Sequence, residues 1–123
     1  MIADQLRART RQCALDIIAL CSQLGFGDLA RVVRPQLLRA ATGIAANYRA
    51  ACRSRTHREF VSRLGIVVEE CDEAELWLDL VEVMSLGDHQ RALDLRAEAT
   101  ELVAVMSASR RTALQRLKRG PDS

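Results

Sequence analysis

Apolar residues recur at intervals of three and four positions in four successive segments, and this spacing restricts the fold more than any other feature of the chain. The repeat places one apolar stripe along each predicted helix, and four such stripes are buried only when the helices pack against one another. In chain order the stripes contain Leu6, Thr10, Cys13, Ile17, Leu20 and Leu24; Leu37, Ala41, Ile44, Tyr48 and Ala51; Phe60, Leu64, Val67, Cys71, Ala74, Leu78 and Val81; and Ala92, Leu95, Ala99, Leu102, Met106, Ser109 and Ala113. The pattern therefore predicts an all-α fold with one shared core.

Capping residues mark the ends of the predicted helices. We expect helices over about 4–24, 28–52, 57–85 and 88–118, within a single domain covering residues 1–123. Asp28 and Asp88 are predicted N-caps, and Thr56 with Glu59 has the form of a capping box. Gly87 is predicted to end the third helix as the residue after its C-cap. Because the connections are short, we expect an antiparallel, up-down-up-down four-helix bundle.

Pro35 falls inside the second predicted helix. Proline lacks the backbone N–H and its ring crowds the preceding turn, so it kinks or interrupts a helix. The sequence leaves both outcomes open: one kinked helix, or a fresh start with residues 28–34 as a separate turn. In either case the apolar stripe after Pro35 continues to about Cys52.

Charge is strongly segregated along the chain, although the net charge is only +2. Residues 31–63 carry eight arginines and one glutamate, for a net charge of +7. Residues 64–101 carry eleven carboxylates and two arginines, for a net charge of −9. Residues 1–30 balance, and residues 102–123 carry +4. Such blocks predict pairing within the molecule or between copies of it.

The stretch ANYRAACRSRTHREF, residues 46–60, concentrates four arginines around the predicted turn between the second and third helices. Guanidinium groups suit phosphate, and the N-terminus of the third helix adds positive potential at the same end of the bundle. The candidate nucleic-acid-binding residues are therefore Arg49, Arg53, Arg55 and Arg58. The alternative is that these arginines pair with carboxylates of the third helix, in the same chain or a neighbouring one.

The third helix carries a second apolar stripe, which a single bundle core does not need. Its members are Val68, Leu76, Trp77, Leu80 and Val83. A monomer would leave Trp77, Leu80 and Val83 in water, and we predict that these three residues form an interface between copies of the chain.

No motif indicates catalysis, a cofactor or a metal. Di-metal bundles use Glu-x-x-His motifs, and neither His57 nor His89 has a carboxylate three residues before it. Both histidines are predicted to be exposed in first turns. No Cys or Ser comes with a histidine placed to activate it, and the four cysteines are spaced as reduced core thiols would be. We expect a non-enzymatic protein without cofactor or metal, located in the cytoplasm because every bilayer-length window contains charge.

Several short motifs resemble the four-helix-bundle family of 23S ribosomal RNA intervening-sequence proteins. They are QLLR at 36–39, ANYR at 46–49, EF at 59–60, LGI at 64–66, and the single residues Glu70 and Trp77. The chain departs from the family pattern at Ala40 and Gly43, where serines are usual, and at Ala50, where glutamate is usual. The missing glutamate leaves the arginine cluster without a local counterion.

The resemblance implies a bacterial protein that assembles as a ring-like homopentamer, with a basic surface associated with nucleic-acid binding. The chain is also similar to the accessory proteins of diversity-generating retroelements, which share that architecture. We therefore expect a homo-oligomer that binds RNA or DNA electrostatically. The alternative is a scaffold oligomer whose arginines form salt bridges between subunits and whose partner is another protein.

Overall fold

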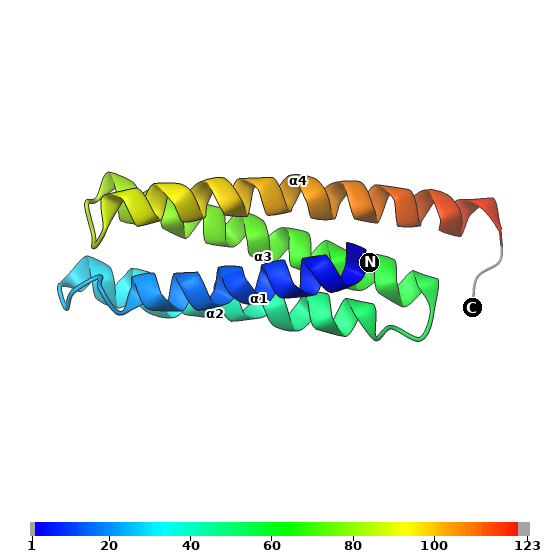
Figure 1. The fold of residues 1–123 in the computed structure, drawn as a ribbon, viewed down its shortest axis with the longest axis horizontal. Helices are drawn as coiled ribbons and strands as arrows, with labels where there is room; N and C mark the ends of the chain where they lie inside the picture. Colours follow the sequence, from blue (N-terminus) through cyan, green and yellow to red (C-terminus); the bar gives the residue numbers. More distant parts are fainter. Residues whose placement is uncertain (1, 121–123) are drawn as a thin grey trace.

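Four long helices make up the fold of residues 2–120, which are the residues that the computed structural model describes (Figure 1). The helices are α1 (Ile2–Cys21), α2 (Asp28–Cys52), α3 (His57–Val83) and α4 (His89–Arg119). They run up, down, up and down, with short turns at alternating ends. The predicted all-α four-helix bundle is confirmed, although α1 and α3 end slightly earlier than expected, at Cys21 and Val83. None of the four helices has an apolar stretch long enough to cross a membrane.

The core consists of the four predicted stripes. Of their members, only Phe60 and Ser109 are partly exposed, and the rest are buried. The fully buried side chains come from every helix and include Ile17, Leu37, Ile44, Leu64, Leu78 and Leu102. Burial of each such side chain contributes about 1.5–3 kcal/mol. α3 packs most closely on α2 and α4, whereas α1 rests mainly on α2 and touches α4 least.

Ion pairs join α1 to α4, which have the least contact of the neighbouring helices. Arg9 of α1 donates two hydrogen bonds to Glu98 of α4, at 2.8 and 2.6 Å, and its guanidinium lies 2.9 Å from Glu101. Arg91 of α4 lies 3.8 Å from Asp16 of α1. The hydrogen bond to Glu98 raises the pKa of Arg9, so the Arg9 guanidinium stays charged over the whole working range of pH.

Side-chain caps open α3 and α4 at the predicted residues, although the carboxylate of Glu59 accepts from the Arg55 N–H, where a full capping box uses the N–H of Thr56. The Thr56 hydroxyl accepts a hydrogen bond from the Glu59 N–H at 3.1 Å. The Asp88 carboxylate accepts one from the Arg91 N–H, also at 3.1 Å. Each cap satisfies an N–H group that has no partner inside its helix.

The start of α2 differs from the prediction. Its N-cap is Gly27, and the predicted cap Asp28 is instead the first helical residue, with no side-chain capping bond. Asp28 still lies where a negative charge favours the helix dipole, and it pairs with Arg31 at 3.4 Å. The helix then continues through Pro35 without a restart, so residues 28–34 are not a separate turn.

The end of α3 is formed by Ser85, and the prediction that Gly87 is the residue after the C-cap is wrong. Ser85 has a left-handed φ of 55°. Its N–H donates to the Glu82 carbonyl at 3.1 Å, and the Leu86 N–H donates to the Val81 carbonyl at 2.9 Å. These two bonds are the Schellman arrangement, in which glycine is the usual left-handed residue.

Two glycines inside helices let side chains of neighbouring helices approach the backbone. A Cβ at Gly65 would lie 3.2 Å from Nε of Arg110. A Cβ at Gly43 would lie 2.7 Å from Oε2 of Glu70. That Glu70 oxygen is buried and has no hydrogen-bond partner in the described residues. Desolvation, reinforced by the charge of Glu73, raises the pKa of Glu70.

Replacing Ser85 by glycine is expected to stabilise the protein by about 1 kcal/mol, because glycine adopts left-handed backbone angles without steric cost. Urea unfolding of Ser85→Gly and wild type measures the difference. The matched control is Gly87→Ala, which should destabilise: φ there is 66°, and the new Cβ would lie 3.1 Å from the Gln23 carbonyl oxygen. A Ser85→Gly protein no more stable than wild type would contradict the assignment.

Replacing Glu70 by glutamine is expected to raise the melting temperature at neutral pH, because an ionised Glu70 leaves a buried oxygen without a donor. The folded pKa is raised, so the fold favours the protonated carboxyl. The stability associated with Glu70 is then complete below its unfolded pKa of about 4.3 and falls as pH rises through the folded value. Melting curves of the two proteins should differ most at neutral pH and converge near about pH 4. A difference that does not depend on pH would refute this explanation.

Candidate nucleic-acid interface

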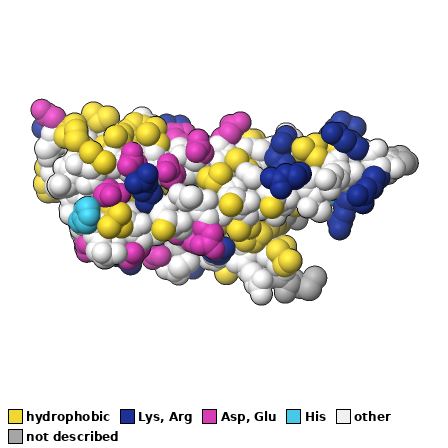
Figure 2. Space-filling model, turned by 90° about the horizontal axis from the view of Figure 1, so that it is seen from above, with side chains coloured by type: hydrophobic (Ala, Val, Ile, Leu, Met, Phe, Trp, Pro, Cys, Tyr) yellow, Lys and Arg dark blue, Asp and Glu magenta, His cyan; other side chains and the backbone are white. Residues whose placement is uncertain are grey.

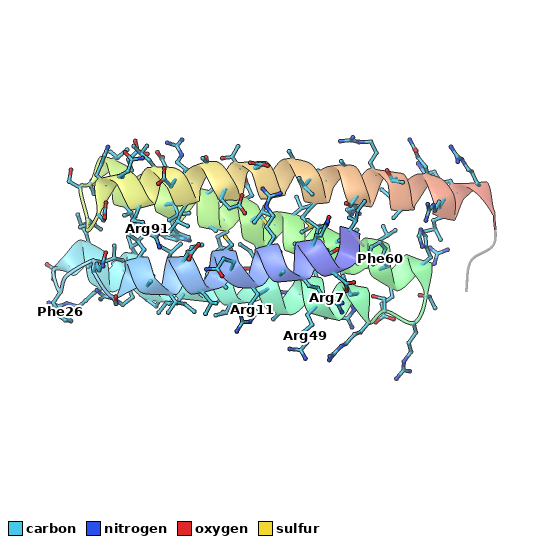
Figure 3. The ribbon with its side chains drawn as sticks, viewed as in Figure 1. Arg7, Arg11, Phe26, Arg49, Phe60 and Arg91 are labelled. Atoms are coloured by element: carbon cyan, nitrogen blue, oxygen red, sulfur yellow. The ribbon has the colours of Figure 1, made fainter. Side chains whose placement is uncertain are left out.

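The four candidate arginines lie together at the end of the bundle where α2 turns into α3. Arg49 is in the last turn of α2, and Arg53 is the C-cap of that helix. Arg55 lies in the following turn and Arg58 in the first turn of α3. All four are exposed, and Figure 3 shows Arg49 extending away from the bundle. The structure thus brings together the residues that the sequence singled out.

The turn that carries this cluster is fixed by Glu59. Its Oε2 accepts a hydrogen bond from the Arg55 N–H at 3.2 Å, and its Oε1 accepts one from the Arg63 guanidinium at 3.0 Å. The bond from the Arg55 N–H and then that from Arg63 lower the pKa of Glu59, so the carboxylate is ionised at neutral pH. This carboxylate is already engaged by Arg63 and does not pair with the four candidate arginines.

A groove of about 560 Å³ lies beside the turn. It is lined by Ala46, Arg49, Ala50, Arg53, Arg55, Glu59 and Arg63. Four of these residues carry guanidinium groups, and the alanines between them leave room for a ligand to approach the helix backbone. Arg63 was not among the candidates, and its place at the end of the basic stretch 31–63 could have indicated it.

The candidate guanidinium groups have no ion pair or hydrogen bond within residues 2–120, whereas most other arginines of the chain are engaged. Those paired with carboxylates are Arg7, Arg9, Arg31, Arg39, Arg63, Arg91 and Arg96. Arg34 and Arg110 donate to backbone carbonyls. The α3 carboxylates that form ion pairs do so with arginines outside the cluster, so pairing within residues 2–120 does not neutralise it.

The basic end of α4 lies at the same end of the molecule. Arg110 donates to the Val61 carbonyl at 3.2 Å, which places the last third of α4 beside the start of α3. The exposed basic residues beyond it are Arg111, Arg116, Lys118 and Arg119. Figure 2 shows Lys and Arg side chains gathered at this end, with Asp and Glu side chains mainly over the opposite half of the visible face.

The predicted interface residues on α3 are partly exposed to solvent in a single chain. Trp77 and Leu80 are half-buried, and Trp77 packs against the core with its indole N–H 3.5 Å from Glu73. Val83 exposes 66% of its surface and Leu76 exposes 50%. Apolar surface is therefore open along α3, chiefly at Val83 and Leu76.

The cysteines do not form a reactive centre in the described part of the chain. All four are free, and Cys13, Cys21 and Cys71 are buried. Burial raises the pKa of Cys13 and Cys21 to about 11 and that of Cys71 to about 12, so few thiolates exist at neutral pH. Across residues 2–120, no three His, Cys, Asp or Glu side chains lie close enough together to hold a metal ion.

The two histidines differ in their exposure to solvent and in their contacts. His89 is exposed, as predicted, but His57 is half-buried. Its Nε2 lies 2.9 Å from the Ala113 carbonyl oxygen, which can only accept, so this nitrogen carries the proton. Its ring also contacts Phe60, with centroids 6.0 Å apart. His57 therefore fastens the start of α3 to α4, a contact between helices that the sequence does not reveal.

Known proteins resemble the chain in sequence and in fold. The family model for the 23S rRNA-intervening sequence protein matches residues 5–108. A crystal structure of a protein with unknown function, from the S23 ribosomal protein family of Bacteroides thetaiotaomicron, superposes with a TM-score of 0.79. The two chains are 23% identical, and the alignment covers 90% of this chain and 99% of that one. No curated protein matches.

Proposed function

The chain belongs to the family of 23S rRNA-intervening sequence proteins, and we propose that it is a non-enzymatic cytoplasmic homo-oligomer that binds RNA or DNA electrostatically. The residues that contact phosphate are Arg49, Arg53, Arg55 and Arg58. The observation that carries the proposal is the exposed cluster of these four guanidinium groups, which other side chains of residues 2–120 do not engage.

A cluster of like charges favours a polyanionic partner. The four arginines repel one another, and a phosphate backbone relieves this repulsion while counterions leave the nucleic acid. Arginine also matches phosphate with two parallel hydrogen bonds, which lysine cannot do. Binding driven in this way weakens steeply as the salt concentration rises.

The aromatic residues support contacts with phosphate over contacts with bases. Tyr48 is 3% exposed, and Trp77 packs against the core. Single-strand binding proteins stack bases on exposed aromatic rings, and neither residue offers such a platform. The exposed ring of Phe26, with 87% of its surface open, lies at the opposite end of the bundle from the four arginines. The proposed binding is therefore based on charge and shape, with little dependence on sequence.

The variant with Arg49, Arg53, Arg55 and Arg58 changed to Gln tests the proposal. Fluorescence anisotropy with a structured RNA and with a DNA duplex, at low and at physiological salt, should show salt-sensitive binding by wild type. The variant should lose at least about a hundredfold in affinity, because it lacks four phosphate contacts. Its control is Arg31→Gln, at the opposite end of the molecule, where Arg31 pairs with Asp28. Wild-type-like binding by the variant would refute the proposal.

A scaffold function is the second candidate, and two exposed carboxylates favour it. Glu69 and Asp72 on α3 are exposed and have no ion pair among the described residues. In an assembly they could receive arginines of a neighbouring copy. Loss of assembly in the four-arginine variant, without RNA or DNA binding by wild type, would favour this alternative.

We also propose that Trp77, Leu80 and Val83 form the interface between copies, in a homopentamer. The open apolar surface of α3, with Val83 66% exposed, supports an interface there.

Replacing Val83 by lysine should lower the assembled mass, because the interface would have to bury an unpaired ammonium group. The substitution should not harm the fold, since a positive charge suits the C-terminal end of α3. Light scattering after size-exclusion chromatography measures the mass. Val32→Lys, at a position on α2 that is 59% exposed, is the matched control and should keep the wild-type mass. An unchanged mass in Val83→Lys would place the interface elsewhere.

A further inference from the structure

A second groove, of about 660 Å³, runs along the other side of α2, between α2 and α1. Arg7 and Arg11 line it from α1, and Arg49 and Arg53 line it from α2. The other lining residues are alanines and Thr42. No carboxylate lines this groove, so it is more uniformly basic than the groove at the α2–α3 turn. The proposed function leaves Arg7 and Arg11 without a role.

The two grooves share Arg49 and Arg53, together with Ala46. These two arginines therefore stand on a ridge with a basic groove on each side. Arg7 and Arg11 line the far side of one groove, and Arg55 and Arg63 line the far side of the other. Figure 3 shows Arg11 and Arg49 extending from α1 and α2 toward the same side of the molecule.

The spacing along the ridge is regular. Arg49 and Arg53 are one helical turn apart, as are Arg7 and Arg11, so each pair spans about 6 Å along its helix. The helices are antiparallel neighbours, and the two pairs therefore form two parallel rows across the groove. Arg11 has no partner in the described residues, and Arg7 is hydrogen-bonded to Asp4. Most of this charge is available to a ligand.

We propose that the nucleic acid bound here is double-stranded, an inference that rests on the proposed function. The Arg49–Arg53 ridge enters the minor groove, where its guanidinium groups contact the phosphates that border the groove, and the two backbones lie in the two basic grooves of the protein. Arg7 and Arg11 contact the phosphates of one strand, while Arg55 contacts those of the other. Arg63, which Glu59 engages, lines that side of the groove.

Duplex geometry matches this arrangement for a physical reason. A minor groove is bounded by two rows of phosphates, and arginine is the side chain that proteins most often insert between them. A single strand supplies one row and fills only one of the two grooves. Small residues on the groove surfaces, Ala45 and Ala46 among them, let a sugar-phosphate backbone approach the helices closely.

The test variant is Arg7→Gln together with Arg11→Gln, in the full chain. Its binding to a short DNA duplex, to an RNA duplex of the same sequence and to unstructured oligothymidylate is followed by anisotropy between about 50 and 200 mM salt. Wild type should bind at least one duplex about tenfold more tightly than oligothymidylate. On the DNA duplex, the slope of log K against log salt should be smaller by about 2 in the variant, because two phosphate contacts are lost.

Two results would overturn the inference: equal wild-type affinity for duplex and oligothymidylate, or an unchanged salt slope in the variant. A change in assembled mass of the variant would also overturn it, because the groove would then be an interface between copies. The four-arginine variant separates this failure from failure of the proposed function. If that variant loses nucleic acid while Arg7→Gln with Arg11→Gln does not, the phosphate site stands and only the duplex arrangement is wrong.

Discussion

Antiparallel packing through short turns determines where charge lies in this molecule. The basic block of the sequence spans the α2–α3 turn and ends in the first turns of α3. The last turns of α4 return to the same end, as the bond from Arg110 to Val61 shows. The acidic block surrounds the opposite turn, between α3 and α4. There Arg96 lies 3.1–3.4 Å from Glu75, Asp79 and Glu82. Arginines in the acidic half are therefore ion-paired, whereas few carboxylates lie near the arginines of the basic end.

The fold was predictable because a core-facing stripe is a property of sequence spacing alone, and each stripe was long enough to be unambiguous. Helix ends were less predictable, since several residues can satisfy the same N–H or carbonyl groups. The N-cap of α2 is Gly27 and not the predicted Asp28. The left-handed residue that ends α3 is Ser85 and not the predicted Gly87. α2 continues through Pro35 although proline lacks the N–H of a helical hydrogen bond, and buried residues of the same core, Val33 and Leu37, lie on either side of it.

The candidate site was only partly predictable. Arg49, Arg53, Arg55 and Arg58 are close in sequence, so any short turn brings them together. Arg7 and Arg11 belong to residues 1–30, whose net charge is zero, so the charge pattern of the sequence did not indicate them. Only the packing of α1 on α2 places them across a groove from Arg49. Glu70 shows the same limit, because only the packing of α3 on α2 buries its carboxylate oxygen beside Gly43, where no donor of the described residues reaches it.

The separation of a basic end from an acidic half makes each chain an electric dipole directed along its helices. Two copies side by side attract when they point in opposite directions and repel when they point the same way. A ring of copies whose helices ran along its rotation axis would have all its basic ends on one rim, where the guanidinium groups would oppose its closure. An anion bound at that rim would remove the repulsion. By thermodynamic linkage, assembly in this orientation and anion binding would then strengthen each other.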